Sequence, residues 1–324
     1  MSLLINNQSV KQLKTLIESH NSIVVFRHVN PDGDAYGSQW GLVTYLKEKY
    51  PYKDIYGVGL NNGSTRHLFP ESDIIEDEII KNSLVIVTDT SNQERIDDQR
   101  YQLATTIIKI DHHPSICDYG TLNIVDDNKS SACEMITDII RILEDDTPIS
   151  LESATYLFTG MKTDTLSFST HKVTWRTLEN ASYLLKSGDI DLAALTDELT
   201  SVEDRIFDYV TYLRLNAQSQ NNNQLIYVYI EPEILSQFNI TSSVAKEYVN
   251  TFKQKKQAKV WVILVNEGHD NYNVSIRSRG LVINDIASKY GGGGHVVAAA
   301  TRELTYQQTQ ALLNDLSQRI QSSQ

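Results

Sequence analysis

Short, nearly continuous apolar runs alternate with helical patterns through the first half of the chain. Four runs are expected to be strands: Ser22–Phe26 (SIVVF), Asp54–Val58, Leu84–Thr88 (LVIVT) and Thr105–Ile110 (TTIIKI). Four segments are expected to be helices: Ala35–Lys49, Ala132–Leu143, Leu151–Met161 and Thr174–Leu185. Strands that are apolar throughout fit a parallel sheet buried on both faces. The alternation predicts an α/β, doubly wound domain with a parallel sheet over residues 1–190.

The second half has a different pattern. The well-charged helical segment from Asp191 to about Ala217 suits a connecting helix, and the polar stretch Gln218–Gln224 (QSQNNNQ) has no periodicity. We therefore expect a helical linker and loop over residues 191–224. Three strands are expected after it: Leu225–Ile230, Lys259–Val265 and Tyr272–Ile276. Three helices are expected there as well: Ser243–Phe252, Ile283–Lys289 and Thr305–Ile320. Residues 225–324 thus predict a smaller, mixed α/β domain.

Composition and charge narrow the class of protein. The 324 residues include 40% apolar and 22% charged residues, which is typical of a globular protein. The formal net charge is −12, but it is uneven: residues 1–239 carry 19 basic and 35 acidic side chains (−16), and residues 240–324 carry 10 and 6 (+4). Affinity for long nucleic acid comes from clustered Lys and Arg. The acidic balance therefore argues against a protein that coats long nucleic acid.

The cysteines and the apolar windows bear on the compartment. Cys117 and Cys133 cannot form a disulfide framework, and no Cys-x-x-Cys pair indicates zinc, so a reducing compartment is the simplest interpretation. The N-terminal MSLLINNQSVKQLK has no long apolar core of the kind found in signal peptides. Apolar windows such as Val260–Val265 are far shorter than the ~20 residues that span a bilayer. We expect a cytoplasmic protein with no membrane partner.

Acidic residues and histidines follow three of the predicted strands. HVNPDGD (His28–Asp34) follows the first strand, Asp89 follows LVIVT, and Asp111–His113 follows TTIIKI. The carboxyl ends of parallel strands lie along one edge of the sheet, where ligands bind, so these side chains should converge. Clustered carboxylates repel one another unless cations bind. Carboxylate with imidazole ligands favours Mn²⁺ over Ca²⁺, and Asp89 is the candidate bridge between two cations.

Each of these blocks also has a structural alternative. Asp32 or Asp34 can cap the helix that starts near Ala35. His112 and His113 can be a satisfied pair near a turn. The shared position at the ends of strands, rather than any single block, supports the hypothesis of a metal site.

A second candidate site is the glycine run Gly291–Gly294, which precedes His295. Each glycine disfavours a helix interior by about 1 kcal/mol, and glycine permits close approach of a ligand to the backbone. No Gly-Lys-Ser/Thr follows, so the run is not a P-loop. Arg277 and Arg279 lie in the same net-positive part of the chain, and an arginine can hold a phosphate through two hydrogen bonds. We expect a phosphate clamp; a plain hairpin turn and unliganded surface cations are the alternatives.

These motifs resemble those of a known family. HVNPDGDAYGS (His28–Ser38), Asp89, Asp111–His113 and GMKTDTLSFST (Gly160–Thr170) are similar, in the same order, to the four motifs of the DHH phosphoesterase family. SIRS (Ser275–Ser278) and the GGGGH run are similar to the family's second domain, DHHA1. The resemblance extends over nearly the whole chain. The two-domain layout is most similar to the bacterial nano-RNase (oligoribonuclease) and pAp phosphatase type.

The resemblance implies a role for each residue. One cation would be held by His28, Asp32 and Asp89, and the other by Asp34, Asp89, His112 and Asp164. Asp111 would orient a ligand imidazole, and His113 would contact the scissile phosphate or protonate the leaving oxygen. The assignment of Asp164 depends on the family alone, because its surroundings have the pattern of an ordinary helix end. The implied substrate-binding residues are Arg277, Ser278, Arg279, Gly292, Gly293, Gly294 and His295.

The resemblance also implies the reaction. We expect a Mn²⁺-dependent phosphohydrolase that uses two cations and a bridging hydroxide. Its substrates would be very short oligoribonucleotides, cut to mononucleotides by 3′–5′ exoribonuclease action, and 3′-phosphoadenosine 5′-phosphate (pAp), cut to AMP and phosphate. Two alternatives stay open: a phosphodiesterase for pApA or cyclic di-AMP, and a non-catalytic nucleotide-binding module. A homodimer is left open as well.

Overall fold

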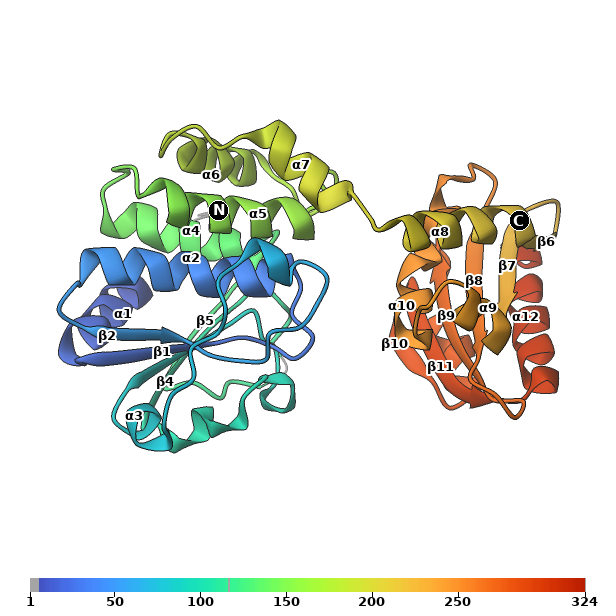
Figure 1. The fold of residues 1–324 in the computed structure, drawn as a ribbon, viewed down its shortest axis with the longest axis horizontal. Coiled ribbons are helices and arrows are strands. Elements are labelled where there is room, and N and C mark those ends of the chain that lie inside the picture. The colour runs from blue at the N-terminus through green and yellow to red at the C-terminus, as the bar shows by residue number, and fades with distance from the viewer. Residues whose placement is uncertain (1–5, 116, 324) are drawn as a thin grey trace. The chain divides into compact units, whose positions relative to one another are not determined.

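The structure is a computed structural model that describes residues 6–115 and 117–323 (Figure 1). The chain divides into two compact units, Met1–Thr200 and Ser201–Gln324. Among the described residues, no helix combines the length and the apolar character needed to cross a membrane.

The first unit contains a sheet of five parallel strands in the order β2-β1-β3-β4-β5. The strands are β1 (Ser22–Phe26), β2 (Asp54–Gly57), β3 (Leu84–Thr88), β4 (Thr106–Asp111) and β5 (Leu122–Val125). The strand order reverses between β1 and β3, which is the switch point where ligands bind in doubly wound sheets. The predicted α/β fold and its four strands are confirmed. The short β5 was not predicted, because four partly buried residues give little periodic signal.

Two apolar cores lie on opposite faces of this sheet. Ile23 and Val25 of β1 face one core, and Val24 and Phe26 face the other. Side chains alternate between the two faces of a strand, so a strand that is apolar throughout must be covered on both. The helices of the unit are α1 (Asn7–Ser19), α2 (Gly33–Lys49), α3 (Asp77–Lys81), α4 (Ala132–Leu143), α5 (Leu151–Asp164), α6 (Trp175–Leu185) and α7 (Leu192–Thr200). Helices α1, α2, α4 and α5 contribute to the first core, and α3 with the 3₁₀ turn Gln99–Leu103 contributes to the core on the other face (Figure 1).

The second unit contains a mixed sheet of six strands in the order β10-β11-β9-β8-β7-β6. The strands are β6 (Gln218–Gln220), β7 (Leu225–Ile230), β8 (Val260–Asn266), β9 (Tyr272–Ser278), β10 (Gly293–His295) and β11 (Ala298–Leu304). Strands β7 and β8 are parallel, and the other neighbouring pairs are antiparallel. The predicted mixed α/β character is confirmed.

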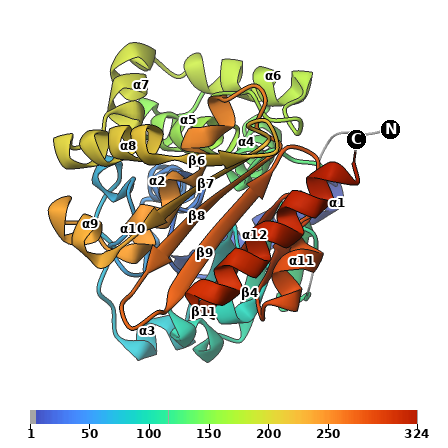
Figure 2. The same ribbon diagram turned by 90° about the vertical axis from the view of Figure 1, so that its right-hand side faces the viewer.

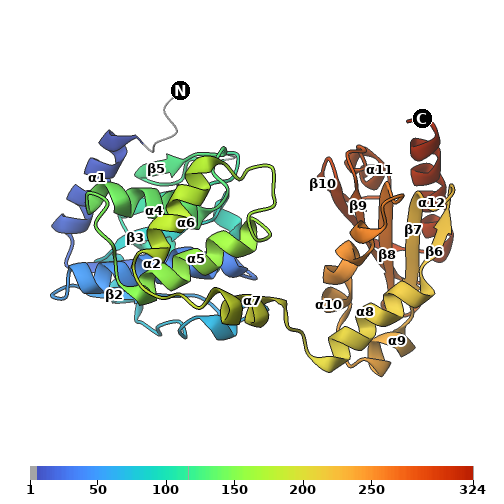
Figure 3. The ribbon, with the colours of Figure 1, turned by 90° about the horizontal axis from the view of Figure 1, so that it is seen from above.

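Helices cover both faces of the second sheet. They are α8 (Asp204–Asn216), α9 (Pro232–Gln237), α10 (Ser242–Glu247), α11 (Asn284–Lys289) and α12 (Tyr306–Gln321). Helices α11 and α12 pack in one core, and α8 and α10 with the 3₁₀ segment Tyr248–Gln254 pack in the other. Figures 2 and 3 show α12 and α8 on opposite sides of the strands.

Two segments differ from the expectation. The single helix expected over Asp191–Ala217 is two helices, α7 and α8, and the chain passes from one compact unit to the other between Thr200 and Ser201. The polar stretch Gln218–Gln224 forms a hairpin, since β6 pairs antiparallel with β7. Three asparagines in its turn, Asn221 to Asn223, have φ between 51° and 67°. Asparagine tolerates this left-handed conformation, so a stretch without periodicity is still ordered.

Candidate metal centre

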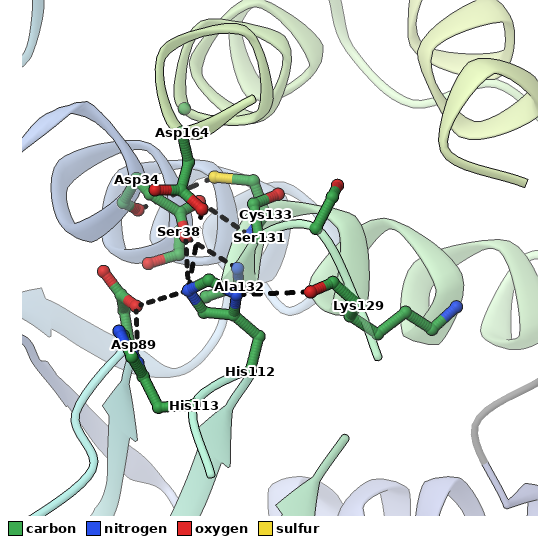
Figure 4. A network of polar contacts seen from close by, with 12 residues as sticks. Asp34, Ser38, Asp89, His112, His113, Lys129, Ser131, Ala132, Cys133 and Asp164 are labelled. Carbon is green, nitrogen blue, oxygen red and sulfur yellow. Dashed lines mark hydrogen bonds and ion pairs between the residues drawn. The ribbon is translucent and has the colours of Figure 1, made fainter. Parts of the chain in front are cut away.

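The predicted acidic residues and histidines converge at the carboxyl edge of the parallel sheet. Asp89 follows β3 and His112 follows β4, while Asp34 is in the first turn of α2 and Asp164 ends α5. Figure 4 shows His112 between Asp89 and the carboxylates of Asp34 and Asp164. Among the described residues, three groups have ligand atoms within 4.8 Å of one another: His28, Asp32 and Asp89; Asp34, His112 and Asp164; and Asp89, His112 and His113. The first two groups contain the six predicted ligands, and we call these two groups the candidate metal centre.

Asp89 links the two groups. Its Oδ2 lies 3.3 Å from His28 Nε2, and its Oδ1 lies 3.4 Å from His112 Nε2. The residue is 2% exposed, and among the described residues Oδ1 has no hydrogen-bond partner. Leaving a buried carboxylate oxygen unpaired is unfavourable, and a cation between the two groups would satisfy it. The donor set therefore fits divalent cations.

The backbone of Asp89 is also unusual. Its φ is 53°, in the left-handed region that residues other than glycine rarely adopt. Such conformations persist where the surrounding structure enforces them, and they cluster at functional sites. Here the amide of Asp89 donates to Ile110 O of the neighbouring strand at 2.9 Å, which holds the residue at the end of β3.

Asp32 and Asp34 are fixed by two different helix N-termini. Asp32 Oδ1 accepts hydrogen bonds from the amides of Asp34 (3.0 Å) and Ala35 (3.1 Å), so Asp32 caps α2. The capping alternative is therefore true of Asp32, which nevertheless lies in a ligand group as well. Asp34 instead accepts from Ala132 N (2.6 Å) and Cys133 N (2.9 Å) at the start of α4. Helix N-termini stabilise negative charge, so the N-terminus of α4 holds the carboxylate of Asp34 in place.

Asp164 reaches the centre because α2 and α5 pack unusually closely. A Cβ on Gly37 of α2 would lie 2.6 Å from Tyr156 O of α5, and one on Gly160 of α5 would lie 2.8 Å from Gly33 O of α2. Only glycine fits at these two positions without displacement of neighbouring atoms. The sequence indicates close packing through the glycines of GDAYG (residues 33–37) and FTG (residues 158–160). It does not indicate which helices pack against each other.

The histidines are held by their second nitrogens. His28 Nδ1 donates to Val29 O (2.8 Å) and His112 Nδ1 to Lys129 O (3.4 Å), which leaves both Nε2 atoms for a cation. Asp111 contacts the neighbouring imidazole. Its Oδ1 lies 2.8 Å from His113 Nδ1, so the imidazole that Asp111 orients is that of His113.

Burial and like charge shift the pKa values of the cluster. Burial, together with the carboxylates of Asp89 and Asp164, raises the pKa of Asp34 well above its usual range. Burial also raises the pKa of Asp164 to about 6, against the opposing effect of His112. Burial alone would lower the pKa of His28, but its hydrogen bond and ion pair with Asp89 outweigh burial and raise it to about 9. Without cations, protons partly compensate this negative charge; cations would displace them.

In the second unit, Arg277 and His295 lie on one face of the sheet. His295 is paired with Ala298, and Ala298 with Arg277, and directly paired residues share a face. Burial lowers the pKa of Arg277. In the described part of the chain its guanidinium makes one hydrogen bond, to Ile276 O (2.9 Å), and no ion pair. Its charge is therefore left for an external anion.

Ser278 and Arg279 have other partners. Ser278 Oγ donates to Leu281 O (2.5 Å). The guanidinium of Arg279 donates to Lys253 O (2.6 Å) and Lys256 O (3.1 Å). Both predicted substrate residues thus already hold neighbouring backbone.

The glycine run forms β10 and the turn before it. A Cβ on Gly292 would lie 2.1 Å from Ala300 O. Gly294 has a φ of 139°, and a Cβ added there would lie 2.4 Å from Ala298 O. Hairpin packing therefore explains these two glycines. A Cβ on Gly293 would meet no atom within 4 Å, so packing does not require glycine there. We call Arg277, Gly293 and His295 the hairpin site.

Comparisons with known proteins agree with this architecture. Residues 22–161 match the DHH family, N-terminal domain, and residues 222–322 match the DHHA1 domain. The chain is 34% identical over 306 residues to the probable bifunctional oligoribonuclease and PAP phosphatase NrnA of Streptococcus mutans, a match that covers 94% of this chain and 97% of that one. It is 35% identical to the bifunctional oligoribonuclease and PAP phosphatase NrnA of Bacillus subtilis, a match that covers 94% of this chain and 96% of that one. The chain therefore belongs to the DHH family.

A solved structure supports the same fold. The crystal structure of an exopolyphosphatase-related protein from Bacteroides fragilis matches with a TM-score of 0.86 and 23% identity, over 99% of this chain and 98% of that one. Phosphoesterases of the DHH family use divalent metals, and the ligand groups around Asp89 fit such ions.

Sequence reasoning missed the groups that hold these ligands. The amides of Ala132 and Cys133 were not identified, although Ser131 with Glu134 has the spacing of a helix start. Lys109, a charged residue inside the apolar run TTIIKI, was not identified either. A lysine in a strand buried on both faces is a signal, because it must find partners there.

Proposed function

We propose that this chain is a metal-dependent phosphohydrolase that degrades short oligoribonucleotides to mononucleotides and converts pAp into AMP and phosphate. The observation that carries the proposal is the buried Asp89, whose two oxygens face the imidazoles of two separate ligand groups. The relatives named as bifunctional oligoribonuclease and PAP phosphatase match over nearly their whole lengths and support this substrate class.

We assign one cation to His28, Asp32 and Asp89, and a second to Asp34, Asp89, His112 and Asp164. Four carboxylates with two imidazoles form a mixed oxygen and nitrogen set that favours Mn²⁺. When bound, two such cations supply Lewis-acid stabilisation to the phosphoryl group and the attacking and leaving oxygens. The protein holds the ligand atoms in place through the amides of α4 and the carbonyls of Val29 and Lys129.

His113 has a different task from the ligands. Its side chain is 43% exposed, and its Nδ1 is held by Asp111. The Nε2 atom is therefore left to contact a phosphate oxygen or to protonate the leaving oxygen, a role that histidine commonly fills. Asp111 supports this role by orienting the ring.

The hairpin site is our candidate for a second phosphate of the substrate. Arg277 offers a guanidinium without an ion-pair partner among the described residues, and such a group binds phosphate through two hydrogen bonds. Gly293 leaves its backbone open, and His295 is exposed. Ser278, Arg279, Gly292 and Gly294 contribute by holding the strand and hairpin that carry these groups.

A product assay tests the function. The chain with Mn²⁺ is incubated with pAp, a short RNA oligonucleotide, pApA, cyclic di-AMP and a long single strand. We expect AMP from pAp and mononucleotides from the short RNA, with little product from the long strand. Failure to hydrolyse both pAp and the short RNA would contradict the proposal. Faster hydrolysis of pApA or cyclic di-AMP would move the assignment to a dinucleotide phosphodiesterase, and binding without hydrolysis would favour a nucleotide-binding module.

A further inference from the structure

Lys109 is a charged residue inside the apolar strand β4, and it is completely buried (0% exposed). Its ammonium group donates to Ser91 O (2.9 Å) and Cys117 O (3.2 Å), and it lies 5.0 Å from the centre of the Tyr119 ring. Its ionic partner among the described residues is Asp111, whose Oδ2 is 3.4 Å from Nζ. A buried ammonium is strongly unfavourable unless it is paired. These contacts therefore account for its burial.

Lys109 and Asp111 meet because residues two apart on a strand lie on the same face. The carboxylate of Asp111 is divided between two partners. Its Oδ2 faces Lys109 and accepts no hydrogen bond in the part of the chain that the structure describes. Its Oδ1 accepts from the backbone amide of His113 (3.3 Å) and lies 2.8 Å from His113 Nδ1. Rotation of the carboxylate would break one of these contacts, so the ion pair fixes its plane.

The same lysine also joins two loops at the candidate metal centre. Ser91, whose carbonyl accepts from Nζ, lies two residues after Asp89. Cys117, the second carbonyl acceptor, belongs to the segment that follows His113. The buried ammonium group of Lys109 thus connects the end of β4 to the segment after β3 and to the segment after His113.

We propose that Lys109 is a positioning residue for phosphoryl transfer. It fixes the carboxylate of Asp111, which holds the His113 ring through Nδ1 and leaves Nε2 to contact the substrate. This inference rests on the proposed function, in which His113 contacts substrate. Lys109 is no ligand of the cations and acts through Asp111.

A second buried lysine provides a matched control. Lys53 is 8% exposed and donates to Glu18 O (3.2 Å) and His20 O (2.5 Å). Its Nζ also lies 5.4 Å from the centre of the Tyr52 ring. Lys53 therefore has the carbonyl and ring contacts of Lys109, but no ion pair among the described residues. Lys53→Met removes a similar set of structural contacts without touching the Asp111–His113 pair.

The first experiment measures kcat and KM for pAp with Mn²⁺, and Mn²⁺ affinity by calorimetry, in wild type, Lys109→Met and Lys53→Met. Acid–base assistance by a positioned side chain contributes about 10²–10⁴-fold, so partial loss of position should lower kcat of Lys109→Met about 10–100-fold. KM and Mn²⁺ affinity should change less than about twofold, as should kcat of Lys53→Met. Equal kcat values for the two variants would overturn the inference.

A double-mutant cycle with His113→Ala tests the route. If Lys109 acts through His113, then Lys109→Met should change kcat less than about twofold in the His113→Ala background. Losses that add fully in the double variant would overturn the inference. Should Lys109→Met fail to fold, Lys109→Gln replaces it in both experiments with the same expectations, because it keeps an amide donor for the carbonyls and removes the charge.

A crystallographic readout separates this inference from the proposed function. In Lys109→Met the 2.8 Å contact between Asp111 Oδ1 and His113 Nδ1 should be lost, and in Lys53→Met it should be kept. Persistence of the contact in Lys109→Met would overturn the role of Lys109 even where the phosphohydrolase activity is confirmed. A wild-type chain that hydrolyses neither pAp nor short RNA would refute the proposed function, while loss of the contact would still support the positioning of His113 by Lys109.

Discussion

The candidate metal centre and the hairpin site hold their polar groups in different ways. In the candidate metal centre, the candidate ligands have a second partner within the protein: Asp34 is held by amides of α4, and His28 and His112 by carbonyl groups. In the hairpin site, Arg277 makes one hydrogen bond within its own strand, and Gly293 faces open space. The first arrangement is organised before a cation binds; the second leaves its groups free for a ligand.

This difference separates two kinds of effect. A preorganised ligand set loses cation affinity and turnover when one member changes, because the remaining groups cannot rearrange. A site whose groups serve no packing role loses substrate affinity while stability is retained. Substitutions in the two regions should therefore differ in which kinetic constant they change.

The largest effect is expected from Asp89→Asn, which removes the charge shared by both ligand groups. We expect kcat to fall about 10³-fold or more, equivalent to ~4 kcal/mol of transition-state stabilisation. The measurement is hydrolysis of pAp with Mn²⁺. Asp73→Asn is the control, because Asp73 contacts Gly57 N (2.9 Å) and lies outside the centre. Full activity of Asp89→Asn would refute the bridging role.

Arg277→Ala should have an intermediate effect. Loss of a charged hydrogen bond to phosphate, about 1.5–3 kcal/mol, corresponds to a KM about 10–100-fold higher, with Mn²⁺ content unchanged. Arg279→Ala is the comparison, since its guanidinium is already bonded to Lys253 O and Lys256 O. We expect a smaller change in KM for Arg279→Ala. Unchanged kinetics in Arg277→Ala would exclude it from the substrate site.

The smallest kinetic effect is expected at Gly293. Because a Cβ there meets no protein atom within 4 Å, Gly293→Ala should keep the stability of the wild type. If phosphate contacts this backbone, the substitution should weaken substrate binding by about 1 kcal/mol, which raises KM about fivefold. Gly292→Ala should instead lose about 1–3 kcal/mol of stability, since its Cβ would lie 2.1 Å from Ala300 O. Thermal unfolding and KM for pAp measure both. Equal stability losses would show that both glycines serve packing alone.

The sequence predicted the parts of the candidate metal centre that lie at the ends of apolar strands. Asp89, His112 and His28 follow runs whose strand character is visible locally, and the topology of parallel sheets then brings them together. Asp164 could not be found in this way, because it reaches the centre through the close contact between α2 and α5. That contact depends on Gly37 and Gly160, which lie far apart in the chain.

Side-chain partners were the least predictable feature. His112 and His113 are adjacent, yet one contacts Lys129 O and the other Asp111. The paths of the chain after β4 and before α4 decide which partner each ring contacts. The local sequence pattern does not predict these paths. The same holds for Lys109, whose ion pair with Asp111 follows from strand geometry only once the strand is known to be buried.

We propose that Asp89 joins two cation sites in the first unit. The most direct measurement is anomalous diffraction at the Mn edge from crystals grown with Mn²⁺, together with the Mn²⁺ content of the protein. We expect two ions per chain, one at His28 and Asp32 and one at Asp34, His112 and Asp164, with an oxygen of Asp89 on each. A single ion, or ions that do not contact Asp89, would contradict it.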